Sequence, residues 1–388
     1  MKFYGFRRPD GTVGIRNHVL IMATVGCAAE TADLVAKNLY GAVSFINQNG
    51  CGESEKNLQR TRDVLIGMAA NPNVYGVICI GLGCEINRMD EFIPMLRVRT
   101  GKPVEQLLIQ EEGGTINAAA KATKMAQRMI IEASRCRREE CDLSELILGI
   151  ECGGSDATSG LASNPVMGLV SDAVVAAGGT AMFSETVEMI GAEHLLAKRA
   201  ATPEVAEKIL ERVRFREAEQ AAVGDDVRKT QPSPGNRDGG ITTLEEKSLG
   251  CIHKGGHTPV MEMLDCAAPP TKKGLVLMDT PCYDMLSVTA KAAAGCQLIV
   301  FTTGRGNAIG NAVTPVFKVT ANSDTAKKLE DNTDLDMSPV LTDGVSLETM
   351  ADETLKDLAE VLSGRLTKAE VLKFGYSEAC ISRICDYC

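Results

Sequence analysis

The sequence predicts an α/β protein in which parallel-sheet units with covering helices form two packed domains. Short runs rich in β-branched residues alternate with longer segments of helical period along most of the chain. Glycine, which accounts for 37 residues, recurs beside polar groups where the expected strands end. The length of 388 residues is two to three times that of a typical domain and therefore favours more than one packed unit.

The first domain is placed at residues 1–142. Strands are expected at 19–25, 42–46, 74–80 and 104–109, and helices at 30–40, 55–70, 88–100 and 115–133. A helical segment thus separates each strand from the next, as in parallel strands joined by crossover helices. A charged stretch at 135–142 precedes a new strand, and the boundary is placed at its end.

The second domain, residues 143–388, continues this alternation. Strands are expected at 146–150, 180–184, 274–278, 297–301 and 316–320, and helices near 165–177, 203–222 and 347–362. The segment 224–240 is rich in Pro, Gly, Asn and Asp, and we interpret it as a linker or surface loop. The chain ends in a C-x4-C-x2-C segment formed by Cys380, Cys385 and Cys388, one ligand short of a closed zinc site.

Charge and composition exclude several classes of function. The 51 acidic residues exceed the 41 basic ones by 10, which gives no electrostatic reason to bind nucleic acid or an anionic membrane. No apolar run reaches the roughly 18 residues of a membrane span, and the N-terminus does not resemble a signal peptide. We therefore expect a cytoplasmic protein whose 14 cysteines are free thiols, some of them metal ligands.

Three glycine-rich loops that follow expected strands each carry a cysteine. They are NGCG at 49–52, GLGCE at 81–85 and ECGGSD at 151–156. If the strands share one doubly wound sheet, the loops emerge at one edge and bring Cys51, Cys84 and Cys152 together. Three thiolates leave a coordination position open, as in catalytic metal sites, and they select iron, iron–sulfur clusters or zinc. The alternative is that each cysteine is a small buried residue in a turn.

Other residues are candidates for acid–base chemistry and for anion binding. The segment SETVEMIGAEH places Glu185 and His194 close together after a strand, with two further glutamates between them. These groups could bind a metal or act as a base, or they could occupy the first turn of a solvated helix. Arg305, in a G-R-G turn after a strand, and Arg16, before a strand, could bind a carboxylate through two hydrogen bonds.

Together the motifs resemble the altronate/galactarate dehydratase family. The resemblance runs from about residue 5 to about residue 375 and rests on long motifs: RPDGTVGIRNHV, GLGCE, IQEEGGT, ECGGSDATSGLASNP, SETVEMIGAEHLL, PSPGNRDGGITTLEEKSLG, MDTPCYD and FTTGRGNAIG. It implies an iron-dependent lyase that eliminates a β leaving group from a small 2-hydroxy acid to give a 2-keto acid.

We therefore expect an iron centre, either Fe²⁺ or an iron–sulfur cluster with an open position. Its expected ligands are Cys51, Cys84 and Cys152. The expected catalytic residues are Glu185, His194 and Glu85, and the expected substrate-binding residues are Arg16, Asn17, Ser155, Asp156 and Arg305.

Three departures from the family pattern leave alternatives open. The chain begins at the large domain, so we expect the large subunit of a split enzyme, with a separate small subunit and self-association into a homo-oligomer. The stretch Asn47-Gln48-Asn49 lacks the histidine usual in sugar-acid dehydratases, and the tail replaces a usual Pro-Trp pair. Dehydration of a sugar acid is the first expectation, and the β subunit of a (2R)-sulfolactate sulfo-lyase, releasing sulfite and pyruvate, is the alternative. A zinc-dependent lyase or hydrolase and a non-catalytic iron-binding scaffold are the others.

Overall fold

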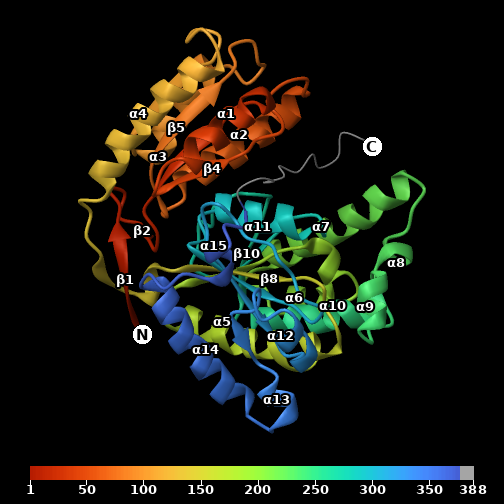
Figure 1. The fold of residues 1–388 in the computed structure, drawn as a ribbon. Coiled ribbons are helices and arrows are strands. Elements are labelled where there is room, and N and C mark those ends of the chain that lie inside the picture. Colours follow the sequence, from red (N-terminus) through yellow and green to blue (C-terminus); the bar gives the residue numbers. More distant parts are fainter. Residues whose placement is uncertain (376–388) are drawn as a thin grey trace.

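A computed structural model describes residues 1–375 and confirms the α/β fold class (Figure 1). Two parallel sheets, each with covering helices, form an upper and a lower unit in Figure 1. The upper unit holds a four-stranded sheet in the order β4-β3-β5-β6. Its strands are β3 (His18–Ala23), β4 (Ala42–Phe45), β5 (Val74–Gly81) and β6 (Val104–Leu108).

Both faces of the four-stranded sheet are covered. In β3, Val19 and Ile21 pack on one face with α1 (Ala29–Lys37) and α4 (Thr115–Ala133). Leu20 and Met22 pack on the opposite face with α2 (Glu55–Ala70) and α3 (Met89–Thr100). Successive side chains of a strand point to opposite faces, so a continuous apolar run fits a strand buried on both sides.

The lower unit contains a seven-stranded parallel sheet in the order β10-β11-β9-β8-β12-β13-β14. Its strands are β8 (Ile147–Cys152), β9 (Thr180–Phe183), β10 (Val260–Leu264), β11 (Gly274–Met278), β12 (Leu298–Thr302), β13 (Val316–Thr320) and β14 (Leu335–Asp336). Every residue of β11, β12 and β13 is buried, as expected of central strands covered on both faces.

The helices of the lower unit lie on both sides of this sheet. They are α5 (Asn164–Ala176), α6 (Glu193–Lys198), α7 (Pro203–Ala222), α8 (Val227–Thr230), α9 (Pro234–Asp238), α10 (Leu244–Ile252), α11 (Asp284–Ala293), α12 (Ser323–Lys328), α13 (Pro339–Thr342), α14 (Leu347–Leu362) and α15 (Lys368–Val371). The expected loop at 224–240 is therefore partly helical. The side chains of Asp226 and Ser233 cap α8 and α9, and Pro234 occupies the first position of α9.

A small antiparallel sheet connects the ends of the upper unit. Strand β1 (Lys2–Arg7) pairs with β2 (Val13–Gly14) and with β7 (Glu139–Asp142). The charged stretch at 135–142 thus returns to the N-terminus. Its strand was missed because β7 has a single buried residue, Cys141, and no apolar alternation.

The two units pack tightly against each other. Helix α2 contacts α11, where Gly67 is required because a Cβ would lie 2.4 Å from the Ala293 carbonyl oxygen. Asn71 donates from Nδ2 to the carbonyls of Ala292 and Cys296, at 2.7 and 2.9 Å. Asn73 donates to the carbonyls of Gln297 and Val313, at 2.9 and 3.1 Å.

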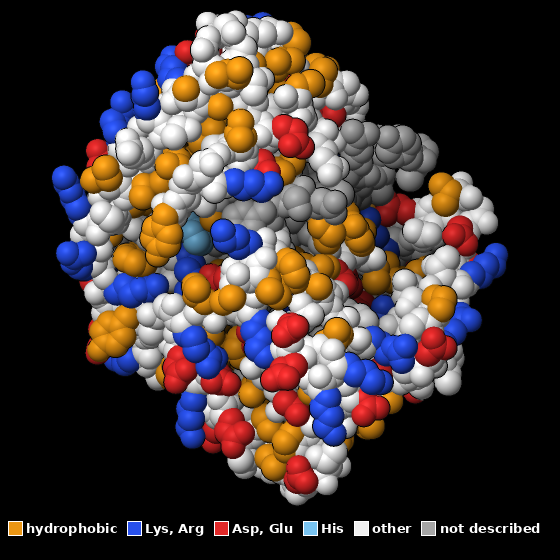
Figure 2. Space-filling view, in the orientation of Figure 1, with side chains coloured by type: hydrophobic (Ala, Val, Ile, Leu, Met, Phe, Trp, Pro, Cys, Tyr) orange, Lys and Arg blue, Asp and Glu red, His pale blue; other side chains and the backbone are white. Residues whose placement is uncertain are grey.

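Across residues 1–375 no helix has the length and apolarity needed to cross a membrane. On the face shown in Figure 2, basic and acidic side chains are interspersed, so no large field of one sign forms there.

Candidate active site

The candidate active site lies at the carboxyl ends of the central strands of the seven-stranded sheet. From β8 the chain continues to β9 on one side, whereas from β12 it continues to β13 on the other. The strand order therefore reverses between β8 and β12, and open α/β sheets bind ligands outside the strand ends at such a point. Strand β8 ends at Cys152, and β9 leads into Ser184 and Glu185.

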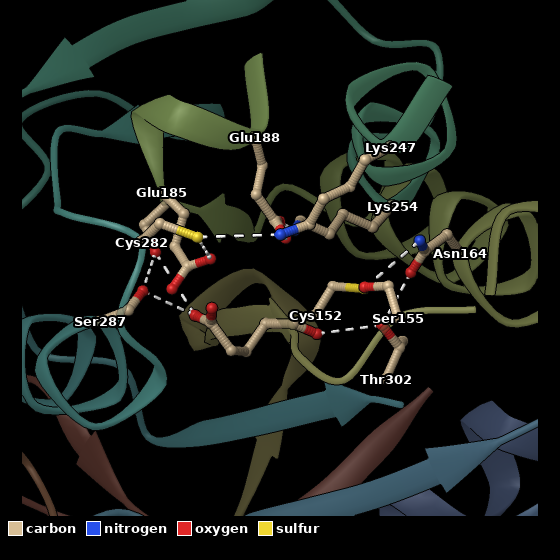
Figure 3. A network of polar contacts seen from close by, with 12 residues as sticks. Cys152, Ser155, Asn164, Glu185, Glu188, Lys247, Lys254, Cys282, Ser287 and Thr302 are labelled. Carbon is tan, nitrogen blue, oxygen red and sulfur yellow. Dashed lines mark hydrogen bonds and ion pairs between the residues drawn. The ribbon is translucent and has the colours of Figure 1, made fainter. Parts of the chain in front are cut away.

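Two thiols and a carboxylate meet in this region. The ligand atoms of Cys152, Cys251 and Glu188 all lie within 4.8 Å of one another, and the three residues are buried. Figure 3 shows Cys152 and Glu188 of this group. The hydroxyl of Ser155 is 2.8 Å from Cys152 Sγ, and Asn164 Nδ2 donates to the same sulfur at 3.6 Å. A hydrogen bond with Cys251 lowers the pKa of Cys152 to about 6 against the effect of burial. Cys152 is therefore largely a thiolate at neutral pH.

Two buried lysines hold the carboxylate of this group. Lys254 Nζ donates to Glu188 Oε2 at 2.6 Å, and Lys247 Nζ lies 3.5 Å from Glu188 Oε1. Burial raises the pKa of Glu188, but the two ammonium groups outweigh burial and leave the pKa below its usual value. Glu188 thus stays ionised in the interior.

A second group contains carboxylates alone. One oxygen each of Glu151, Glu185 and Asp284 lies within 4.8 Å of the others. Glu185 Oε1 and Glu151 Oε1 have no hydrogen-bond partner in the described part of the chain. Burial, then the charges of Glu151 and Glu188, raise the pKa of Glu185 well above its usual value. The same causes raise the pKa of Asp284 to about 7.

The backbone around these carboxylates is strained or closely packed. Glu185 has a φ of 69°, in the left-handed region that side chains other than glycine rarely adopt. Such strain persists where surrounding contacts hold a functional side chain in place. Gly153 faces Asp284, and a Cβ there would lie 2.5 Å from Oδ2.

A fully buried lysine sets the position of Glu151. Lys291, on α11, forms an ion pair with Glu151 and donates hydrogen bonds to Ser184 and Ser287. Ser287 also donates to Glu151 Oε2, at 2.7 Å. Glu151 Oε2 is thereby fixed, and Oε1 is left for the carboxylate group.

The donors fit a thiophilic transition metal. Two thiol sulfurs and a carboxylate are ligands that iron or zinc accepts and that magnesium or calcium does not prefer. Glu188 Oε1 has no hydrogen-bond partner in the described structure, and the ammonium group of Lys247 lies 3.5 Å from it. The structure therefore contains groups that could hold a metal ion.

The three cysteines predicted to bind metal are not brought together. Cys51 and Cys84 are exposed on the loops after β4 and β5, whereas Cys152 is buried at the end of β8. Among the described residues neither exposed cysteine belongs to a group of three ligands. The strands do not share the single sheet that the prediction required, because β4 and β5 lie in one sheet and β8 in another.

The predicted catalytic residues are also separated. Glu185 lies in the carboxylate group, whereas His194 is exposed near the start of α6. Glu85 is buried in the upper unit, where its carboxylate accepts hydrogen bonds from the amides of Leu82 and Gly83, at 3.2 and 2.6 Å. These bonds shape the GLGCE loop.

Two of the predicted substrate-binding residues, Arg16 and Asn17, bind other parts of the protein. Arg16 is buried and binds the carboxylate of Glu370, with Nε 2.6 Å from Oε1. Asn17 accepts a hydrogen bond from Arg8 and donates to the Ala133 carbonyl. In the described structure both side chains are thus engaged away from the candidate site.

The other three lie near the carboxyl ends of β8 and β12. Ser155 contacts Cys152, while the Asp156 carboxylate accepts hydrogen bonds from Ser159 and Asn322. Arg305 is exposed, and its backbone amide donates to the Gly154 carbonyl. Ser155, Asp156 and Arg305 thus flank the candidate site.

Several residues of the site were not predicted, although the sequence carries a signal for some of them. Cys251, Lys247 and Lys254 lie in the segment EKSLGCIHKGG, and Cys282 and Asp284 lie in TPCYD after β11. Lys291 stands among alanines in TAKAAAG, where a charged residue interrupts a run of small residues. A lysine at a buried helix position needs a buried anion, which is the signal that points to Glu151.

Comparisons with known proteins agree over nearly the whole chain. The family model described as "D-galactarate/Altronate dehydratase, C-terminal" matches residues 143–386, and "D-galactarate dehydratase/Altronate hydrolase, second domain" matches residues 5–134. The (2R)-sulfolactate sulfo-lyase subunit beta of Chromohalobacter salexigens is 38% identical over 98% of this chain and 97% of its own length. The altronate dehydratase of Bacillus subtilis is 36% identical over 95% of this chain and 75% of its own length. The galactarate dehydratase (L-threo-forming) of Escherichia coli is 33% identical over 94% of this chain and 73% of its own length.

Proposed function

Since this chain belongs to the D-galactarate/altronate dehydratase family and is an enzyme of the lyase class, we propose that it dehydrates a sugar acid to a 2-keto acid. The observation that carries the proposal is the buried set of thiols, carboxylates and lysines at the reversal of strand order between β8 and β12. Such a set combines ligands for a metal with groups that transfer protons.

We infer that Cys152, Cys251 and Glu188 hold an iron ion. When bound there, iron supplies a Lewis acid for the carboxylate and hydroxyl of a 2-hydroxy acid. This group has two cysteines, and Cys282 belongs to a separate group with Glu185 and Glu188. Both counts are below the four cysteines that ordinarily hold an iron–sulfur cluster, which favours a single ion.

Proton transfer falls to the carboxylates beside this group. Glu185 Oε1 accepts the proton α to the substrate carboxylate, and its raised pKa makes it a stronger base than an exposed glutamate. The ammonium group of Lys247 favours its ionised form. Asp284, with a pKa of about 7, donates a proton to the β hydroxyl, which leaves as water. The enol product then becomes the 2-keto acid.

Lys247 and Lys254 stabilise the charge that develops in this reaction. Both stay protonated, since nearby anions raise their pKa values against the effect of burial. Their ammonium groups compensate the negative charge that spreads onto the substrate carboxylate as the α proton leaves. In an interior of low dielectric this compensation is stronger than it would be in water.

We infer that the chain works with a separate small subunit. The sulfo-lyase relative is named as a subunit, and this chain matches 97% of it. The dehydratase relatives are longer, because the match covers 73–75% of their length. Self-association of the chain stays a prediction.

The match with the sulfo-lyase subunit, over nearly the whole of both chains, favours the release of sulfite from sulfolactate as a second candidate function. In the sulfo-lyase reaction, sulfite leaves from the β carbon in place of water and the product is pyruvate. The same base and lysines would serve, because the two eliminations share their α-proton transfer.

The test is metal content and product analysis on protein purified without oxygen. We expect about one iron per chain and little acid-labile sulfide. Cys251→Ser should lose the iron, whereas Cys141→Ser, at a buried thiol in β7, should keep it. Iron retained by Cys251→Ser would contradict the ligand set.

Turnover is then measured with a candidate small subunit present. Formation of a 2-keto acid from D-altronate or galactarate supports dehydration, and sulfite from sulfolactate supports the second candidate. No elimination from any of the three would contradict the proposed function.

A further inference from the structure

A pocket of about 310 Å³ opens beside the candidate active site. It lies between α10 and a one-turn π-helix at Ser159–Ser163. π-helical turns within helices are frequent at functional sites. The pocket is therefore a candidate route for substrate.

The inner wall of the pocket reaches the inferred metal ligands. Cys251 itself lines the pocket, together with Ser155 and Asn164, which both contact the Cys152 sulfur. Lys247, also in the wall, lies 3.5 Å from Glu188. A molecule in this pocket would thus meet both inferred thiol ligands, one directly and one through its hydrogen-bonding neighbours.

The mouth is marked by two exposed leucines. Leu161, on the π-helix, is 66% exposed, and Leu249, on α10, is 44% exposed. Gly160 and Gly250 allow the two elements to approach, because a Cβ at either would lie 3.2 Å from the Cα of the other. The two elements therefore touch at these glycines, and both line the pocket that includes the exposed leucines and Cys251.

The charged side chains that line the pocket are either acidic or already paired with other groups. Asp156 and Glu246 line it, and Lys247 is its single ammonium or guanidinium group among the described residues. That ammonium is bound by Gln231 Oε1 at 3.0 Å and lies beside Glu188. The described lining thus offers no free ammonium or guanidinium group to a second anionic group.

We propose that this pocket admits the substrate and holds the part beyond its reacting carbons. It selects an uncharged hydroxylated arm, as in an aldonate, over an arm that ends in a second carboxylate, as in an aldarate. The reason is that a carboxylate placed there would lie beside the buried Asp156 without a cation to pair with it, whereas hydroxyl groups can exchange hydrogen bonds with polar walls. The inference rests on the proposed function, since it concerns the same site.

The first test uses the absence of tryptophan from the sequence. Leu161→Trp places a single indole at the mouth, and Ile131→Trp, at a 53% exposed position on α4, is the matched control. D-altronate, an aldonate, should change the emission of Leu161→Trp at concentrations about 10-fold lower than galactarate, an aldarate, and should leave the control unchanged. No change, or an equal response to both acids, overturns the proposal.

The second test adds a cation at the mouth. Leu249→Arg should raise the ratio of kcat/KM for galactarate to kcat/KM for D-altronate about 10-fold, and Ile131→Arg should leave it unchanged. An unchanged ratio in Leu249→Arg overturns the selection. If the unmodified enzyme acts on neither acid, that result contradicts the proposed dehydration, and the fluorescence titration still decides whether the pocket binds an aldonate.

Discussion

Replacing Lys291 by Met should destabilise the protein by about 3–5 kcal/mol, the usual cost of leaving one member of a buried ion pair alone. Lys291 is 0% exposed and Glu151 is 1% exposed, so water cannot solvate the carboxylate that remains. Met has nearly the volume of Lys, and little of the loss would come from a cavity. Ser287 still donates to Glu151 Oε2 in the variant, which places the expected value toward the lower end of the range.

The double variant Glu151→Gln/Lys291→Met is the matched comparison. It removes both charges and keeps an amide that can hydrogen-bond Ser287, so we expect it to recover at least about 2 kcal/mol relative to Lys291→Met. Urea unfolding followed by circular dichroism gives the free energies, provided the slopes agree. A double variant as unstable as Lys291→Met alone would refute the reasoning, because the loss would then come from packing.

Three further predictions concern other parts of the fold. Asn73→Ala removes hydrogen bonds to Gln297 and Val313 in the second unit and should cost about 2–3 kcal/mol in urea unfolding; a loss below about 0.5 kcal/mol would contradict its role in joining the units. Gly153→Ala should cost about 1–3 kcal/mol, seen as a lower midpoint of thermal unfolding, because its Cβ would overlap Asp284; an unchanged midpoint would show that the carboxylate moves freely. Burial lowers the pKa of His18 to about 4. Since the unfolded chain binds this proton near pH 6.5, stability should fall as pH falls from about 6.5 to 4. His18→Gln should show a smaller loss over that range in urea unfolding, and an identical loss would contradict the assignment.

Many helices and strands were predictable from the sequence because the spacing of their apolar residues and the residues at their ends are local signals. The helices expected at 55–70, 115–133, 203–222 and 347–362 have those bounds in α2, α4, α7 and α14. Thr202 and Ser346 cap two of them with side-chain hydrogen bonds, a local signal that needs no tertiary contact. Strand β10 and the antiparallel pair β1 and β7 were missed. Strands β1 and β7 pair over a long sequence separation, whereas β10 pairs with the nearby β11 but is only partly buried.

The site was less predictable, because it depends on which strands share a sheet. The sequence around a cysteine that follows a strand does not show whether the strand belongs to the four-stranded or the seven-stranded sheet. Cys84 and Cys152 were therefore both predicted to be metal ligands of one site. Glu185 could be named from its segment. The pairing of Cys152 with Cys251 could not, because it joins the end of β8 to a helix about a hundred residues later.

The sequence separation of Cys152 and Cys251 also determines when the candidate site can form during synthesis of the chain. The four-stranded sheet is complete once residue 108 has left the ribosome, and its most distant strand pair, β3 with β5, joins Val19 to Gly76. Strand β8 sits in the middle of the other sheet, yet its neighbour β12 is made about 150 residues after it. Nascent chains that stop before Cys251 therefore carry Cys152 without the thiol that stabilises its thiolate. The hydrogen bond that lowers the pKa of Cys152 can thus form only after residue 251 has been added, when about a third of the 388 residues are still to be made.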